Sequence, residues 1–203
     1  MIDKVKIENA AIEIYSKHFK KGVPAEKLPK IIAKEGIVLK EADGGEIFLG
    51  VFTKSPQDTP CIVINSRISN IGRKNFTLAH EFGHFVLQHY LHTVSFICSK
   101  NEIFEESREV SLQEKEANYF ASCFLLPKDK VVREFTNWFR FRINPNGRVF
   151  LNIDLNNGKS FSNWKAISSN LKKKYCVSTE ALKIRLVNLG LINNFGGTKK
   201  GQN

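Results

Sequence analysis

Two histidines and a glutamate stand in the segment FTLAHEFGHFVLQHY, residues 76–90. Residues four apart project from one face of a helix, so His80 and His84 can bind a single metal ion through two imidazoles. Glu81 lies about a third of a turn from His80, too displaced to be a third ligand from this face. It can instead hold a water molecule beside the metal and act as a general base. The pattern His-Glu-x-x-His therefore predicts a zinc-dependent hydrolase.

The alternative is a packed amphipathic helix in which this short pattern arose by chance. The neighbouring residues favour the metal. They are apolar and predict a deeply buried helix: Phe76, Leu78, Ala79, Phe85, Val86 and Leu87. Burying two histidines and a glutamate together without a partner is unfavourable. Gly83 lowers helix stability by about 1 kcal/mol relative to Ala, so a glycine here suggests that another group approaches closely.

A catalytic zinc ion needs a third protein ligand. A second helix is predicted to begin near residue 112, with Ser111 as its N-cap and Glu114 completing a capping-box pattern. Glu114 and Asn118 are four residues apart and share one face. We therefore expect the Glu114 carboxylate to reach the metal and the Asn118 amide to hold a ligand histidine. Glu116 lies on another face and is the alternative third ligand.

The histidines that follow the motif are weaker candidates. In a helix predicted over residues 73–90, His89 lies about 140° around the axis from His84. His92 lies three residues further on. We expect both to be surface or capping histidines. The longer metzincin pattern would place a third histidine at position 90, which is occupied by Tyr90.

These helices need a sheet and further helices to position them. Residues 36–52 read as two short strands around a DGG turn, and residues 61–65 as a β-branched strand. A further strand is expected at residues 148–154. Near the N-terminus a helix is predicted to place Val5, Ile12, Tyr15 and Phe19 on its inner face. The expected fold class is α+β, with a small antiparallel sheet packed on the active-site helices and a helical C-terminal unit.

The C-terminal part is strongly basic. The net charge is +11, and residues 121–203 hold 15 Lys and Arg against 4 Asp and Glu. Such asymmetry indicates an acidic partner, often nucleic acid, or else a solvated basic surface. Residues 162–192 predict two helices of helix-turn-helix proportions, with Ser178 as the N-cap of the second. The candidate DNA or partner contacts are Lys165, Lys172, Lys173, Lys174, Lys183 and Arg185.

Other features of the sequence indicate the cellular compartment of the protein. No stretch approaches the ~20 apolar residues of a membrane span, and the charged N-terminus lacks a signal-peptide pattern. We therefore expect a cytoplasmic protein without a membrane partner. The cysteines are far apart and form no CxxC pair, so we expect buried thiols rather than disulfides or zinc ligands. They are Cys61, Cys98, Cys123 and Cys176.

Taken together, TLAHEFGHFVLQH at residues 77–89 and EKEANYFASCFLLP at residues 114–127 resemble the ImmA/IrrE family of metallopeptidases. The IVIN strand, the approach through Arg73, Phe76 and Thr77, and the closing VSTEALKIRLVNLGLI resemble it too. The resemblance spans residues 24–192. It implies a zincin-like fold with one Zn²⁺ held by His80, His84 and Glu114, and with Glu81 as the catalytic base.

The resemblance also implies a biological role. Family members act in the bacterial cytoplasm, and several cleave a helix-turn-helix repressor, which relieves repression on prophages, mobile elements or stress regulons. We expect an N-terminal helix (1–22), a zincin-like peptidase domain (23–143), a basic helical unit packed on it (144–192) and a disordered tail (193–203).

The expected function is therefore a zinc endopeptidase that acts as an anti-repressor. The alternatives are a non-catalytic DNA- or protein-binding regulator, or a toxin–antitoxin component, with a structural metal site. For the C-terminal unit we favour packing and partner docking over DNA contact, because the resemblance includes this ending.

Overall fold

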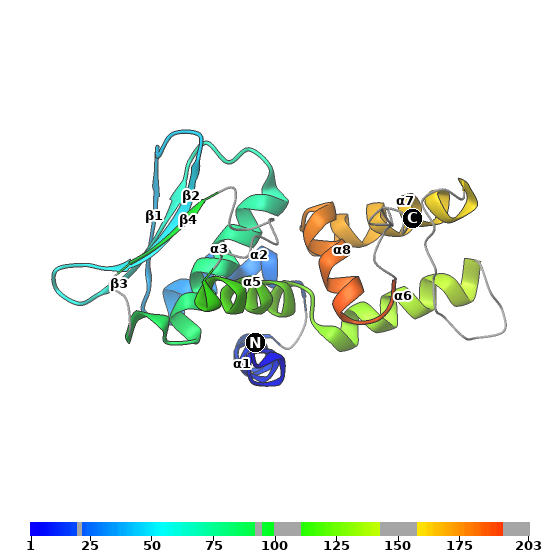
Figure 1. Ribbon diagram of the computed structural model, residues 1–203, viewed down its shortest axis with the longest axis horizontal. Helices are drawn as coiled ribbons and strands as arrows, with labels where there is room; N and C mark the ends of the chain where they lie inside the picture. The colour runs from blue at the N-terminus through cyan, green and yellow to red at the C-terminus, as the bar shows by residue number, and fades with distance from the viewer. Residues whose placement is uncertain (20–21, 92–94, 100–110, 143–157, 193–203) are drawn as a thin grey trace, which may run out of the picture.

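The computed structural model describes residues 1–19, 22–91, 95–99, 111–142 and 158–192 (Figure 1). The sheet lies at one end of the molecule, α3 and α5 run beside it, and α6, α7 and α8 form the other end. The elements in chain order are α1 (Lys4–His18), α2 (Pro24–Lys34), β1 (Val38–Ala42), β2 (Phe48–Lys54), β3 (Pro60–Asn65), α3 (Ile71–Val86), the 3₁₀ helix η1 (His89–Leu91), β4 (Ser95–Ser99), α5 (Leu112–Leu125), α6 (Lys128–Arg142), α7 (Gly158–Tyr175) and α8 (Thr179–Asn188). The α+β class is confirmed. The strand expected at residues 148–154, the tail at 193–203 and His92 lie outside the described residues.

The sheet is mixed, not antiparallel as predicted. Within the described residues its order is β1-β3-β2-β4, and β1 runs parallel to β3 while β2 runs antiparallel to both neighbours. The expected hairpin between β1 and β2 does not form because β3 lies between them. The connecting segment is instead held at the end of β3. The Asn65 amide donates to the carbonyls of Gly45 and Phe48, each at 2.7 Å.

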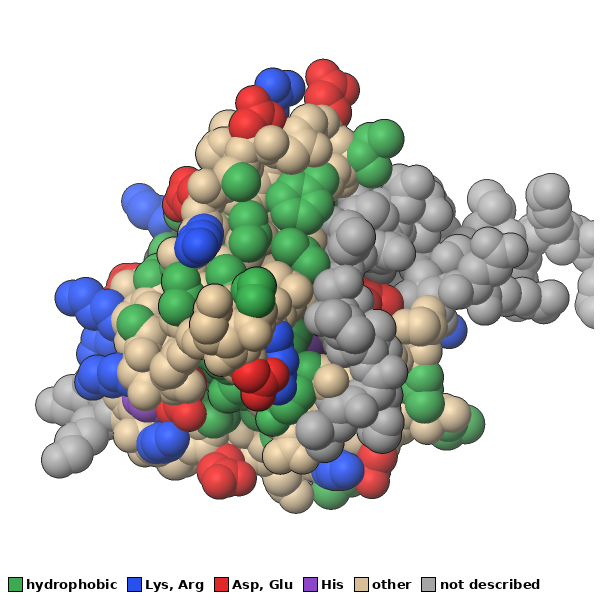
Figure 2. Space-filling view, turned by 90° about the vertical axis from the view of Figure 1, so that its left-hand side faces the viewer, with side chains coloured by type: hydrophobic (Ala, Val, Ile, Leu, Met, Phe, Trp, Pro, Cys, Tyr) green, Lys and Arg blue, Asp and Glu red, His purple; other side chains and the backbone are tan. Residues whose placement is uncertain are grey.

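One face of the sheet packs against α3. Gly50 of β2 lies against Thr77 of α3, and the Phe52 ring meets Phe85 edge-on at 6.1 Å. The opposite face carries the half-buried Val51 and Val63, which stand side by side in the β2–β3 register. Figure 2, which views the molecule from this end, shows hydrophobic side chains bordered by charged ones. The amphipathic sheet therefore supports α3 on a single face.

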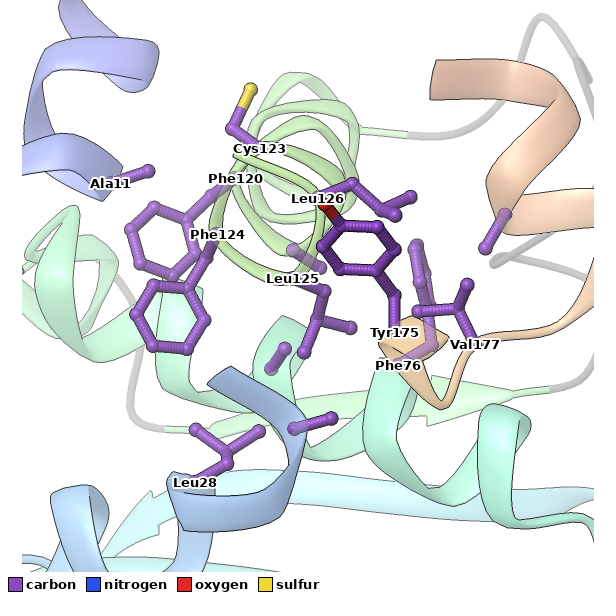
Figure 3. Packing of buried hydrophobic residues seen from close by; sticks show 14 of the residues in the cluster. Ala11, Leu28, Phe76, Phe120, Cys123, Phe124, Leu125, Leu126, Tyr175 and Val177 are labelled. Carbon is purple, nitrogen blue, oxygen red and sulfur yellow. The ribbon is translucent and has the colours of Figure 1, made fainter. Parts of the chain in front are cut away.

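Helix α5 lies at the centre of the core. Figure 3 shows Phe120 and Phe124 of this helix pointing toward Ala11 and Leu28, and Leu126 lying near Tyr175 and Val177. The expected inner residues of α5 are all buried, which confirms the predicted face: Ala117, Phe120, Ala121 and Phe124.

Helix α3, which carries the His-Glu-x-x-His motif, comes into close contact with helix α5 at Gly83. A Cβ atom there would lie 2.9 Å from Cδ1 of Phe120 and 3.4 Å from Cα of Ala117. Only glycine allows this spacing without movement of α5. The close approach inferred from Gly83 is therefore present, and its partner is a neighbouring helix of the same chain.

Helix α1 turns only part of the predicted face to the core. Phe19 is buried and Tyr15 packs against the core as predicted, but Val5 and Ile12 are 71% and 52% exposed, and Ile7 and Ala11 are buried instead. Apolar residues occur on several sides of this helix, so periodicity alone was ambiguous. Its orientation is set by contacts with α5 and α8, which lie far away in the sequence.

Arg185 is fully buried, so the prediction that it contacts DNA or a partner was wrong. Its guanidinium donates to the Leu126 carbonyl at 3.0 Å, to the Glu8 carboxylate at 2.6 Å and to the Cys123 sulfur at 3.2 Å. These three groups come from α1 and from the C-terminal end of α5. Arg185 therefore joins α8 to both helices.

The C-terminal unit is also bound to the N-terminal end of α3. A Cβ atom at Gly72 would lie 2.5 Å from the backbone of Val177 and Ser178, so the two backbones are in close contact. The Asn75 amide donates to the Cys176 carbonyl at 2.8 Å. Ser178 caps α8 by accepting from the amide of Ala181, as predicted. The turn between α7 and α8 is therefore part of the support of α3.

Exposed basic residues lie on α7 more than on α8. Lys165, Lys172 and Lys173 are exposed, and we call them the basic face. Lys174 is also exposed and pairs with Glu134 at 2.6 Å, while Lys183 is half-buried. Among the described helices, none has both the length and the apolar character needed to cross a membrane.

Candidate metal centre

His80, His84 and Glu114 converge at one point between α3 and α5. One potential ligand atom from each lies within 4.8 Å of the others, and all three residues are buried. Nε2 of His80 lies 3.0 Å and Nε2 of His84 lies 3.2 Å from the Glu114 carboxylate, and the two Nε2 atoms are 3.1 Å apart. The structure thus brings Glu114, rather than Glu116, to the two histidines.

Local sequence signals place Glu114 at this point. The Ser111 hydroxyl accepts from the Glu114 amide at 3.2 Å, which starts α5 one turn before the convergence. Leu126 ends the helix directly before Pro127, as expected. The carboxylate therefore projects from the first turn of α5 toward the α3 face that carries the histidines.

The proton positions at this site favour a cation. Oδ1 of Asn118 lies 2.9 Å from Nδ1 of His80 and can only accept, so Nδ1 carries the proton. In a neutral imidazole Nε2 is then a lone-pair acceptor, yet it faces a carboxylate oxygen of Glu114. A cation between these acceptors satisfies all of them. Two imidazole nitrogens and one carboxylate are a protein donor set of catalytic zinc sites, in which water takes the fourth position.

The electrostatic state of the ligands also suits a metal. Burial lowers the pKa of His84 to about 4, so its imidazole is neutral at pH 7. Burial acts in the opposite sense on Glu114, but the two adjacent histidines outweigh it and lower the pKa of its carboxyl to about 2. Neutral imidazole and ionised carboxylate are the forms that coordinate a metal ion.

Comparison with known proteins agrees with this geometry. The family model described as the IrrE N-terminal-like domain, a peptidase family, matches residues 32–187. The chain belongs to this family. Family membership points to a metallopeptidase, and the His80–His84–Glu114 group is where a metal ion could bind.

Among solved structures, the IrrE-like chain is similar to a Mycobacterium tuberculosis transcriptional regulator, with a TM-score of 0.53 and 17% sequence identity. The match covers 90% of this chain and 46% of that protein, so the chain spans less than half of the regulator's length. At this identity the similarity shows a shared fold. No curated protein matches the chain.

Glu81 directly follows His80 on α3 and lies against strand β2. It is fully buried, and a Cβ atom at Gly50 would lie 3.2 Å from its Oε1 and 2.9 Å from Cγ2 of Thr77. Any larger residue at position 50 would displace the carboxylate. Gly50 is therefore a site residue that sequence reasoning missed, because only the packing of β2 on α3 reveals it.

His89 is not a surface residue as predicted. It is buried, and its Nδ1 lies 2.9 Å from Nδ1 of His84, while its Nε2 lies 3.1 Å from Oε2 of Glu116. The predicted helix would have carried it away, but α3 ends at Val86 and Gln88 adopts a left-handed conformation with φ 59°. This turn directs His89 back to its own helix.

Proposed function

We propose that this IrrE-like chain is a zinc-dependent endopeptidase. The observation that carries the proposal is the convergence of His80, His84 and Glu114, with the buried Glu81 next to His80 in the chain, in a member of a metallopeptidase family. Two imidazoles and a carboxylate would hold the metal ion, and Asn118 would orient His80 through its Nδ1.

The proposed mechanism assigns the proton transfers to Glu81. A bound zinc ion supplies a Lewis acid that polarises the scissile carbonyl and lowers the pKa of water to about 7. Glu81 takes the proton of the attacking water and passes it to the leaving amine. Its burial against β2 holds the carboxylate in one position, which favours directed proton transfer.

The proposed substrate is a helix-turn-helix transcriptional repressor in the bacterial cytoplasm, so that the peptidase acts as an anti-repressor. The support is the family membership together with the basic face on α7, which offers a docking surface for an acidic or DNA-bound repressor. Weak contact with nucleic acid through the same lysines belongs to this proposal.

Elemental analysis tests the metal site first. We expect about one zinc ion per chain, the number in a catalytic site of this ligand set, and its loss in His84→Ala and Glu114→Gln. His18→Ala and Glu35→Gln are matched controls, because this pair is similarly buried but lies outside the ligand group. A wild-type chain that cannot be loaded with zinc would rule out the proposal.

Cleavage is tested with purified helix-turn-helix proteins encoded beside the gene. We expect a discrete cut by wild type and cleavage at least about 100-fold slower by Glu81→Gln, the smallest contribution of a general base, although this variant keeps its zinc. If Glu81→Gln relieves repression as well as wild type does, the chain is instead a binding regulator with a structural metal.

A further inference from the structure

We propose that His89 and Glu116 are positioning residues that hold His84 in the tautomer which presents Nε2 to the metal. This inference rests on the proposed zinc site and extends it beyond the three ligands. The observation behind it is an unbroken line of contacts that starts at His84, passes through His89 and ends at a carboxylate on α5.

The two contacts indicate which ring nitrogens of His84 and His89 carry protons. His84 can ligate through Nε2 only if its proton is on Nδ1. That proton then points to Nδ1 of His89, 2.9 Å away, which accepts it. A neutral His89 that accepts at Nδ1 carries its own proton on Nε2, and this proton is donated to Oε2 of Glu116 at 3.1 Å. Glu116 accepts only, so it selects the tautomer of both imidazoles.

The other tautomer of His89 is unfavourable at both of its contacts, with His84 and with Glu116. With its proton on Nδ1, His89 would face the N–H of His84 with a second N–H, and its Nε2 would face the Glu116 carboxylate with a lone pair. Moving the His84 proton to Nε2 would relieve the first clash but remove the lone pair that binds the metal. The acceptor-only carboxylate of Glu116 therefore favours the metal-binding form.

The surrounding structure keeps His89 in place. The η1 helix follows the left-handed turn at Gln88. The ring of Tyr90 stacks on Phe85 of α3 and lies 6.0 Å from Phe52 of β2, and the Lys54 ammonium sits over its face at 4.7 Å. These contacts of Tyr90 fix the backbone directly after His89, and the buried imidazole is held by its own contacts with His84 and Glu116.

The pair also explains why α5 carries two acidic residues on different faces. Glu114 projects to the ligand atoms themselves, and Glu116, two residues later, reaches the far side of His84 through His89. His80 is held differently, by the neutral amide of Asn118. Since a carboxylate raises the basicity of a histidine ligand, His84 becomes the stronger donor of the two.

Zinc affinity of the purified full chain, measured by competition with a chromophoric chelator, tests the inference. Loss of such outer partners weakens metal binding about 10- to 100-fold. We expect this loss in His89→Leu and a loss near 10-fold in Glu116→Ala. In His89→Asn the Oδ1 atom takes the place of Nδ1 as acceptor, so affinity should largely return. The visible spectrum of the Co²⁺-loaded protein should change most in His89→Leu, less in Glu116→Ala and least in His89→Asn.

His18→Leu and Glu35→Ala serve as controls. They break a His–carboxylate pair of similar burial that takes no part in the ligand group, and should leave the zinc affinity at the wild-type value. If His89→Leu does not fold, Glu116→Ala, at a partly exposed position, decides alone.

Wild-type zinc affinity and an unchanged Co²⁺ spectrum in His89→Leu and Glu116→Ala would overturn this inference while the metal site stands. A wild-type chain that binds no zinc would overturn both the inference and the proposed function.

Discussion

Replacing Gly83 with Ala should weaken metal binding while leaving the protein folded. The new methyl group would lie 2.9 Å from Cδ1 of Phe120 and 3.4 Å from Cα of Ala117, where ordinary contacts begin near 3.4 Å. Phe120 is fully buried and packs against both Phe82 and Phe124, so its ring cannot turn away freely. Helix α5 must therefore move outward by a few tenths of an ångström.

The effects on the fold and on metal binding can be estimated one after the other. An alanine in a helix interior gains about 1 kcal/mol over glycine, and overpacking a core loses about 1–3 kcal/mol. The free energy of unfolding should therefore fall by about 0–2 kcal/mol. Metal–ligand distances lie within about 0.2 Å of their standard values, so a shift of a few tenths of an ångström distorts a site. Because Glu114 moves with α5 while His80 and His84 stay on α3, zinc affinity should fall by at least about 10-fold, the smaller loss seen on disturbing a metal site's outer contacts.

Two measurements check this prediction. Urea unfolding of the metal-free protein gives the stability, and chelator competition gives the zinc affinity. Gly50→Ala is the matched control, because its methyl group would press on Glu81 and Thr77 but not on α5. We expect Gly50→Ala to keep the zinc affinity and lose catalysis. Equal zinc affinity of Gly83→Ala and wild type would show that the α3–α5 spacing does not set the site.

Three further predictions concern the base, the buried ion pair and the basic face. Glu81→Gln should keep its zinc and lower kcat for a cleaved repressor about 10²- to 10⁴-fold, the contribution of a general base; a smaller loss would assign the proton transfer to another group. Glu8→Ala should lower the free energy of unfolding by about 2–3 kcal/mol, because it leaves the buried charge of Arg185 without its carboxylate. The loss is smaller than for a fully buried pair because the Glu8 side chain is 21% exposed and solvent weakens the interaction. The surface pair variant Glu134→Ala should change stability by under about 0.5 kcal/mol in the same urea titration, and equal effects of the two would contradict the buried role of Arg185. Reversing the charge of the three lysines of the basic face should raise KM for an acidic repressor, most strongly at low salt, and leave kcat unchanged; a salt-independent KM would argue against docking on α7.

The sequence alone was sufficient for features that depend on residues close together in the chain. The spacing of His80, Glu81 and His84 determines their relative positions once a helix forms, because a helix repeats every 3.6 residues. The caps at Ser111 and Ser178 are equally local, since each hydroxyl binds an amide three residues ahead. These predictions needed no knowledge of how the helices pack.

Only the tertiary structure decided features that join distant segments. Glu114 and Glu116 are both acids near the start of one helix, and the crossing of α5 over Gly83 selects the first as the candidate ligand. Residues 38–42 and 48–54 look like a hairpin, but β3 offers pairing partners to both strands and separates them.

His89 and Arg185 show the same limit at single residues. If α3 were a regular helix through residue 89, His89 would face away from the candidate metal site. Instead, the left-handed conformation of Gln88 turns His89 back toward His84. Arg185 reads as a surface cation, yet Glu8, 177 positions away, and the Leu126 carbonyl supply its partners inside the core. Spacing along a chain specifies geometry only within one element. The position of a side chain relative to other elements depends on how their surfaces pack, and that is a property of the whole fold.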